Sequence, residues 1–254
     1  MTDPAAILPK GTQPEGAKNQ QEASEQVRKM FTRIAPRYDL LNHLLSAQMD
    51  RLWRARTARE LAPILERPGA VVLDLCCGTG DLAFALERKA KAKIIGADFS
   101  HTMLVRAREK AQSVNRSSPM PLFEADALHL PFAGNSFDLV TSAFGFRNLA
   151  NYEEGLREIA RVLKPGGIIG ILDFAEPAPG FLGDAYRFYT STMLPKIGGW
   201  ISGDREAYAY LPKSVARFFR PDELASVLTS VGYTQVRYHL MTLGSVVLHL
   251  AVRS

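Results

Sequence analysis

The stretch Val71-Val72-Leu73-Asp74-Leu75-Cys76-Cys77-Gly78-Thr79-Gly80-Asp81 decides the fold. Its first five residues read as a buried parallel strand, and the apolar run 82–86 continues as a helix. Between the two, Gly78 and Gly80 carry no Cβ, so that a ligand can lie against bare backbone at a helix N-terminus. Asp74 adds a carboxylate suited to a cation or a hydroxyl group. We therefore expect these three residues to contribute to a ligand site.

A second acid strengthens this interpretation. The apolar run Ile94-Ile95-Gly96-Ala97 ends at Asp98, 24 residues after Asp74. In a doubly wound sheet this acid lies beside the first glycine turn, where it can accept hydrogen bonds from both hydroxyls of a ribose. Met103, one turn further on, is expected either to pack on a flat heteroaromatic ring or to belong to the core. A similar glycine turn also opens dinucleotide-binding domains.

Composition restricts the class of protein. The 254 residues are enough for one large α/β domain or a domain with a small cap, and the net charge of +5 is too mild to indicate nucleic-acid binding. No apolar run is long enough to cross a bilayer, so we expect a soluble, cytoplasmic protein. The two cysteines, Cys76 and Cys77, are neighbours that form neither a disulfide framework nor a four-ligand zinc site. We expect no metal.

The order of elements indicates one domain over residues 22–254, preceded by a disordered tail over residues 1–21. Residues 22–66 are expected to form two helices that fold over the ligand face as a lid. Strand patterns alternating with helices then predict a doubly wound sheet, and the aromatic-rich insertion 175–220 is expected to cap it. The predicted strands after Asp98 cover residues 122–124, 137–143, 168–174, 233–239 and 245–252.

Successive motifs along the chain resemble those of class I S-adenosylmethionine-dependent methyltransferases. They are 74–81, Asp98, Asp126-Ala127, 130–132 with 137–138, and 163–167. The flanking stretches 35–42, 144–148, 194–198 and 208–211 resemble the ubiquinone/menaquinone biosynthesis C-methyltransferases more specifically. The resemblance implies an α/β, Rossmann-like fold, with a seven-stranded, mostly parallel sheet, helices on both faces and a helical cap.

The same resemblance implies S-adenosyl-L-methionine as cofactor, with Thr79, Asp98, Asp126 and Ala127 among its contacts. One departure concerns Cys76, which replaces the first glycine of the general methyltransferase pattern. The turn must therefore accommodate a thiol-sized side chain at this position.

Methylation of a hydroquinone carbon needs an electron-rich ring, which loss of a phenolic proton provides. Arg147, just past the strand 137–143, is expected to stabilise the phenolate, because a guanidinium favours the anion. Tyr38 and Asp39 in the lid are candidate partners, and Asn148 is a candidate for orienting the ring. Alternatively, Arg147 forms a structural salt bridge and Asp39 caps a helix. The histidines 43 and 239 are further candidate bases.

The resemblance implies C-methylation of a polyprenylated quinol, demethylmenaquinol to menaquinol, with 2-methoxy-6-polyprenyl-1,4-benzoquinol or both as alternatives. We expect transient contact with the inner face of a membrane and no nucleic-acid partner, while the question of a homodimer stays open. Three other classes share the core motif: nucleic-acid methyltransferases, nicotinamide dehydrogenases and non-catalytic S-adenosylmethionine-binding proteins. The sequence Ala143-Phe144-Gly145-Phe146 lacks the Pro-Pro-aromatic signature of base-methylating enzymes.

Overall fold

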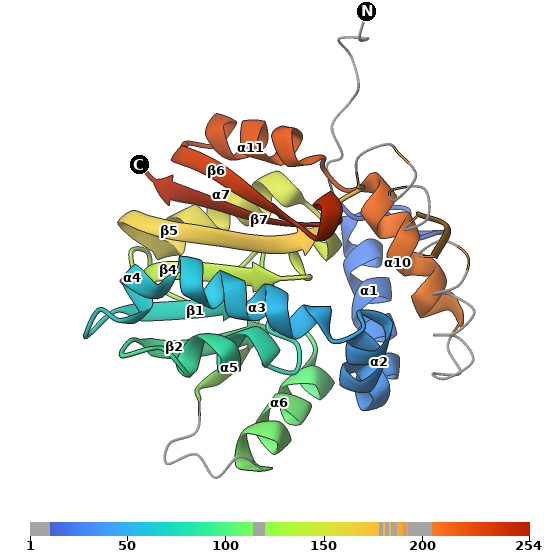
Figure 1. Cartoon of the computed structure of the whole chain (residues 1–254), viewed down its shortest axis with the longest axis horizontal. Helices are drawn as coiled ribbons and strands as arrows, with labels where there is room; N and C mark the ends of the chain where they lie inside the picture. Colours follow the sequence, from blue (N-terminus) through green and yellow to red (C-terminus); the bar gives the residue numbers. More distant parts are fainter. Residues whose placement is uncertain are drawn as a thin grey trace, which may run out of the picture.

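The computed structural model describes residues 11–113, 120–177 and 205–254, together with residues 180, 183, 187–189 and 192. A seven-stranded sheet has the order β3-β2-β1-β4-β5-β7-β6 (Figure 1). β1 to β5 pair in parallel, whereas β7 runs antiparallel to both β5 and β6. The strands are β1 Val71–Leu75, β2 Lys93–Asp98, β3 Leu122–Glu124, β4 Phe137–Ala143, β5 Leu163–Phe174, β6 Tyr233–Met241 and β7 Val246–Arg253.

Strand order reverses between β1 and β4, which makes the carboxyl ends of these two strands a topological switch point. Open α/β sheets bind their ligands at such a point. The predicted strands at residues 122–124 and 137–143 have these bounds in the structure. β5 begins five residues before the predicted start at residue 168, because Leu163 already pairs with Phe137 ahead of a register shift.

Apolar side chains on alternate strand positions build a core on each face of the sheet. Leu73 of β1 packs on one face with Leu156 and Leu224, whereas its neighbour Val72 packs on the other with Leu82. The helices are α1 Gln20–Ile34, α2 Tyr38–Leu45, α3 Met49–Glu60, α4 Ala62–Leu65, α5 Asp81–Glu87, α6 His101–Ser113, α7 Tyr152–Val162, α10 Arg205–Arg217 and α11 Pro221–Ser230. Short 3-10 turns are η1 Ala35–Arg37, η2 Phe146–Asn148 and η4 Thr242–Gly244.

The helices α1, α2 and α10 gather at the edge of the sheet where the parallel strands end (Figure 1). This is where the sequence predicts a lid and a cap, although residues 193–204 of that cap lie outside the described residues. No helix in the described part of the chain combines the length and apolarity that a membrane span requires.

Residues 11–19 fall within the stretch for which the composition predicts a disordered tail, yet they are held against the domain. Thr12 is buried, and its backbone N–H donates to the carbonyl of Leu149 at 2.8 Å. Arg217 donates to the carbonyl of Gln13 at 2.8 Å. The polar composition of this segment concealed these contacts, because they are made by backbone and hydroxyl groups rather than by apolar side chains.

Candidate active site

Asp74 holds the glycine turn in place through hydrogen bonds. It is buried at the end of β1, and its Oδ2 accepts from the Ala83 N–H at 2.9 Å while Oδ1 accepts from the Thr141 hydroxyl at 2.9 Å. Burial raises the pKa of Asp74 to about 7, although both hydrogen bonds favour the anion. Asp74 thus ties the turn to α5 and β4, and it is not among the residues that line the cavity above the turn.

Asp98 lies at the end of β2, as the sequence predicts. Its Oδ2 accepts from the Gly78 N–H at 2.8 Å, and its Oδ1 accepts from the Ser100 N–H at 2.9 Å. Burial raises the pKa of Asp98 to about 6 against the opposing effect of these backbone donors. The backbone N–H of Phe99 is a third donor to this carboxylate, so one of its four lone-pair sites is left for a ribose hydroxyl.

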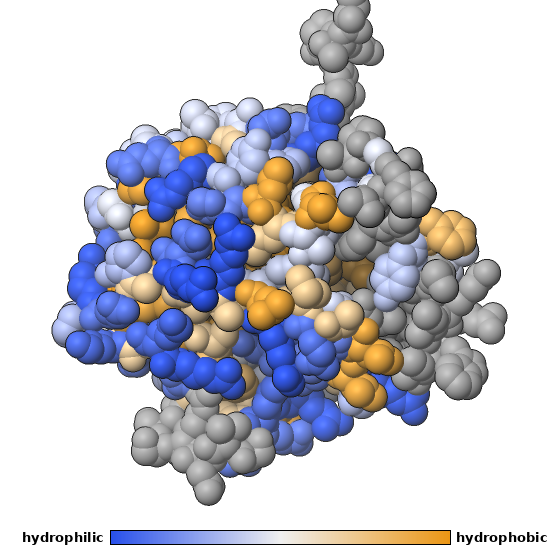
Figure 2. Space-filling view, viewed as in Figure 1, coloured by the Kyte–Doolittle hydropathy of each residue, from blue (hydrophilic) through white to orange (hydrophobic). Residues whose placement is uncertain are grey.

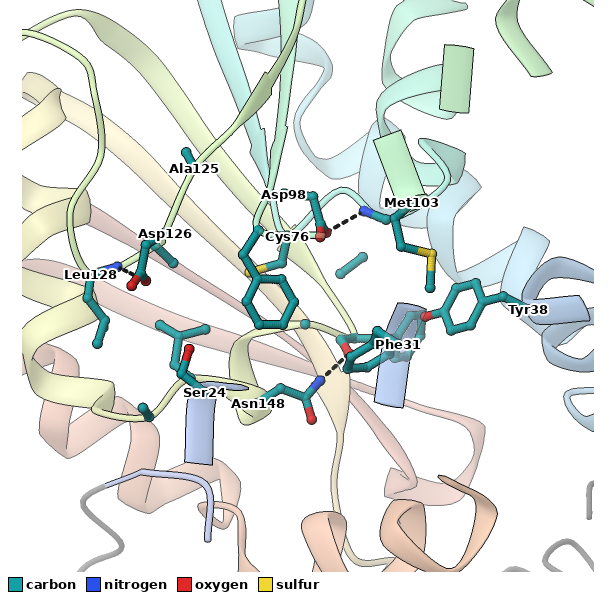
Figure 3. A pocket seen from close by; sticks show the side chains of 18 residues that line it. Ser24, Phe31, Tyr38, Cys76, Asp98, Met103, Ala125, Asp126, Leu128 and Asn148 are labelled. Carbon is teal, nitrogen blue, oxygen red and sulfur yellow. Dashed lines mark hydrogen bonds between the residues drawn. The ribbon is translucent and has the colours of Figure 1, made fainter. Parts of the chain in front are cut away.

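We call the space above the turn cavity A. Figure 3 shows Asp98 and Met103 on one side of it, Asn148 on the opposite side, Asp126 at one end and Tyr38 at the other. Its lining combines a few polar groups with apolar and aromatic side chains, as in small-molecule sites. The predicted cofactor residues that line it are Gly78, Asp98, Met103, Asp126 and Ala127; the others, Asp74, Thr79 and Gly80, do not.

Cys76 occupies a backbone position that normally calls for glycine. Its φ of +54° lies in the left-handed region. A Cβ added to Gly145 would lie 2.4 Å from the Cys76 Cβ, which is closer than atoms can approach. The thiol-sized side chain at position 76 is therefore accommodated because residue 145 has none.

A second, larger cavity, cavity B, opens beside cavity A and has a volume of about 650 Å³. Its wall comes from α1, α2, α3 and α10 and from the ends of β4 and β5, and it is mostly apolar. Phe31, Tyr38 and Phe144 line both cavities, so the two meet at these three rings. A donor in cavity A can thus face an acceptor in cavity B.

Arg147 lies in the wall of cavity B within a buried ion pair. Its Nη1 donates to Asp173 Oδ1 at 2.7 Å, and the two residues are 5% and 0% exposed. Burial acts to lower the pKa of Arg147, but the charge and hydrogen bond of Asp173 raise it above its ordinary value. The guanidinium therefore stays charged and does not serve as a base.

The remaining donors of Arg147 show what it can still bind. Nε donates to the Ser214 hydroxyl at 3.4 Å, and Nη1 also donates to the Phe144 carbonyl. Among the described residues, Nη2 has no hydrogen-bond partner. Arg147 thus forms a salt bridge, as the alternative interpretation predicts, while its role toward a phenolate stays a prediction.

Tyr38 lines both cavities, whereas Asn148 lines cavity A. Tyr38 shares a hydrogen bond with the Asn42 side chain, and burial raises the pKa of its phenol. The Asn148 Oδ1 accepts from the Tyr210 hydroxyl at 2.9 Å. The structure thus brings together Tyr38, Arg147 and Asn148 from α2 and η2.

Asp39 points elsewhere, to a polar cluster that joins the lid to the glycine turn. Its Oδ1 accepts from the Thr79 hydroxyl at 2.5 Å and its Oδ2 from Lys110 at 2.8 Å. Lys110 also pairs with Asp81. Asp39 lines neither cavity, and its hydrogen bonds instead hold α2 against the glycine turn and α6.

Sequence reasoning missed a second acid in the lid. Asp50 at the start of α3 lines cavity B, and its Oδ2 lies 2.7 Å from His43 Nδ1. Ser46 donates to Asp50 Oδ1 at 2.8 Å, and Arg54 pairs with Oδ2. His43 appeared isolated in the sequence because Asp50 approaches it only across the turn at residues 46–48.

The comparisons with known proteins agree with this geometry. The model of the ubiE/COQ5 methyltransferase family matches residues 18–253. A demethylmenaquinone methyltransferase of Thermus thermophilus is 48% identical over 225 residues, which are 88% of this chain and 100% of that protein. One from Porphyromonas gingivalis is 38% identical over the whole of both chains. The ubiquinone/menaquinone biosynthesis C-methyltransferase UbiE of Pseudomonas fluorescens is 39% identical, covering 94% of this chain and 93% of that protein.

Solved structures establish the fold. The [4+2]-cyclase SpnF superposes with a TM-score of 0.66 at 17% identity, covering 96% of this chain and 99% of that chain. A SAM-dependent methyltransferase of Thermotoga maritima superposes with a TM-score of 0.61 at 20% identity, covering 89% and 99%. The predicted Rossmann-like fold and methyltransferase activity are confirmed. The chain belongs to the ubiE/COQ5 methyltransferase family.

Proposed function

We propose that this enzyme transfers a methyl group from S-adenosylmethionine to a ring carbon of a reduced, polyprenylated quinone, converting demethylmenaquinol to menaquinol. The observation that carries the proposal is the junction of cavities A and B at Phe31, Tyr38 and Phe144. A smaller cavity that holds a few polar groups suited to a ribose meets a larger apolar one, and their shared wall is aromatic. Transfer between two bound molecules requires such adjoining sites.

The residues of cavity A fit S-adenosylmethionine. The Asp98 carboxylate would accept from a ribose hydroxyl, and Asp126 with Ala127 and Met103 would surround the adenine ring. The aromatic rings of Phe31 and Tyr38 suit a sulfonium cation, since ring faces attract positive charge. When bound, this cofactor supplies an already activated methyl group.

The residues around cavity B orient and activate the acceptor. Arg147 Nη2 would donate to a ring oxygen of the quinol and stabilise the phenolate, which enriches the ortho carbon in electrons. Because Asp173 already neutralises Arg147, the contribution comes from an oriented hydrogen bond rather than from a free charge. Tyr38, together with Asn148 in the wall of cavity A, would fix the ring opposite the methyl donor, and Asp39 would hold α2 against the glycine turn.

We further propose that the mouth of cavity B docks on a membrane that contains anionic lipids. Three exposed apolar residues are direct sequence neighbours of residues in the wall of cavity B. They are Leu52, Phe188 and Leu243, which are 61%, 60% and 66% exposed. Figure 2 shows apolar groups over α2 and α3 on this face of the molecule. Exposed apolar side chains beside the wall of an apolar cavity suit contact with lipid, where a polyprenyl tail resides.

Backbone strain at η4 supports this assignment. Thr242, Leu243 and Gly244 all have positive φ, at +46°, +57° and +85°. Two non-glycine residues in the left-handed region cost about 1–2 kcal/mol each, and here they hold an apolar side chain out in solvent. Arg51, next to Leu52, is also exposed and can meet an anionic headgroup.

A methyl-transfer assay tests the substrate. The purified enzyme is incubated with S-adenosylmethionine and either demethylmenaquinol or 2-methoxy-6-polyprenyl-1,4-benzoquinol, with the oxidised quinones as controls. We expect the faster reaction with demethylmenaquinol and none with the oxidised forms. The benzoquinol is the second candidate, because the names of some relatives include both ubiquinone and menaquinone biosynthesis. A protein that binds S-adenosylhomocysteine but methylates neither quinol would contradict the proposal.

A further inference from the structure

The N-terminal strap, residues 11–17, reaches the candidate active site although the family match begins only at residue 18. Its Thr12 is 7% exposed and is held by the hydrogen bond from its N–H to the Leu149 carbonyl. A Cβ on Gly11 would lie 1.9 Å from the Ala150 carbonyl oxygen, so the backbone of the strap packs directly on the backbone that follows η2. Its position next to Asn148 is therefore tightly defined.

A directed chain of hydrogen bonds leads from the strap to Asn148. The Tyr210 hydroxyl donates to Asn148 Oδ1 at 2.9 Å, which uses its single hydrogen. The Thr12 hydroxyl lies 2.7 Å from the same phenol oxygen. Thr12 must therefore be the donor in this contact, and the chain runs from Thr12 through Tyr210 to the amide oxygen of Asn148.

The consequence is a fixed orientation of the Asn148 amide. With Oδ1 held by Tyr210, the Nδ2 group faces the other way and donates to the Phe144 carbonyl at 3.4 Å (Figure 3). A flipped amide would place Oδ1 against the Phe144 carbonyl, so that two acceptors would face each other and this bond would be lost. Nδ2 carries a second hydrogen, and Asn148 lines cavity A together with Phe144, which lines both cavities.

We propose that Thr12, acting through Tyr210, is a positioning residue that holds the Asn148 amide so that Nδ2 donates to a ring oxygen of the acceptor at the junction. This inference rests on the proposed quinol methylation. It assigns a functional contact to a segment that lies outside the family match, and it makes the strap part of the acceptor site.

The test compares Thr12→Val, which keeps the shape and removes the hydroxyl, with Thr12→Ser, which keeps the hydroxyl. We expect Thr12→Val to lower kcat/KM for demethylmenaquinol about threefold to tenfold, as expected for one buried hydrogen bond, and Thr12→Ser to stay within about twofold of the wild type. Glu15→Gln is the matched control, because Glu15 in the same strap pairs with Lys213 at the surface and lines neither cavity A nor cavity B. The dissociation constant of S-adenosylhomocysteine should change less than about twofold in all three variants.

A second readout does not depend on turnover. In ¹⁵N-labelled protein, the side-chain amide signals of Asn148, assigned by their loss in Asn148→Asp, should shift in Thr12→Val and be restored in Thr12→Ser. Equal kinetics or equal amide spectra for the two Thr12 variants would overturn the proposal, as would a loss of S-adenosylhomocysteine affinity that accounts for the lost activity. A wild-type enzyme without quinol methylation would instead refute the proposed function, and with it the acceptor contact, while the amide spectra still report the orientation.

Discussion

Replacement of Arg147 by lysine separates its two roles. Of the five N–H donors of the guanidinium, those on Nη1 and Nε already serve Asp173, the Phe144 carbonyl and Ser214, and Nη2 is left for the acceptor. A lysine keeps the positive charge beside the fully buried Asp173 but has no second amino group. We therefore expect Arg147→Lys to fold and to lose mainly turnover.

The magnitudes follow from these contacts. Removal of one donor to a developing oxyanion costs about 2.7–4 kcal/mol, so kcat should fall about 10²–10³-fold in Arg147→Lys. The free energy of unfolding should fall by only about 1–2 kcal/mol. Arg147→Met leaves Asp173 buried and unpaired, which should cost about 3–5 kcal/mol of unfolding free energy in addition to the lost turnover.

The assay combines urea unfolding with steady-state methyl transfer on the same preparations, and S-adenosylhomocysteine titration provides the control for the cofactor site. A kcat of Arg147→Lys within about threefold of the wild type would refute the role of Nη2. The ion pair with Asp173 would then be a purely structural one.

Three further predictions concern the rest of the site. The pKa of Asp98 is raised to about 6, and a ribose hydroxyl needs its ionised carboxylate, so the affinity for S-adenosylhomocysteine should be constant above pH 7 and fall toward about tenfold per pH unit below pH 6. Asp98→Asn should bind weakly and without this pH dependence. Calorimetry at several pH values measures both affinities. Gly145→Ala should lower the free energy of unfolding by about 1–3 kcal/mol because the new Cβ clashes with Cys76. The double variant Gly145→Ala/Cys76→Gly should recover most of this loss, and equal stability of the single and double variants in urea would contradict the predicted clash. Leu243→Glu should reduce sedimentation with anionic lipid vesicles about fivefold or more without lowering the melting temperature, and unchanged vesicle binding would argue against the docking surface.

Local patterns predicted the centre of the fold. The strand and glycine turn at 71–81 and the acid at the end of β2 follow from short-range periodicity, because the neighbouring strands of a parallel sheet bring their carboxyl ends together. Asp98, Met103, Asp126 and Ala127 were predicted as cofactor residues, and all four line cavity A. Their assignment to S-adenosylmethionine stays a prediction until binding is measured.

Contacts between distant segments could not be predicted in this way. Arg147 pairs with Asp173 because β4 and β5 end side by side, and the sequence shows only an arginine and an acid 26 residues apart. The bond between Thr12 and Tyr210 spans 198 residues and joins a polar segment that composition alone assigns to disorder. Asp74 looked like a ligand for the same reason as Asp98, since its use by Ala83 and Thr141 becomes visible only once the strands are paired.

In the proposed reaction, cavities A and B bring a methyl donor to a reduced quinone ring. The most direct measurement is transfer of an isotope-labelled methyl group from S-adenosylmethionine to demethylmenaquinone, followed in parallel with the reduced and the oxidised form. We expect labelled menaquinol and an equal amount of S-adenosylhomocysteine from the reduced form alone. Label in the oxidised quinone at a similar rate, or no label in either form, would contradict it.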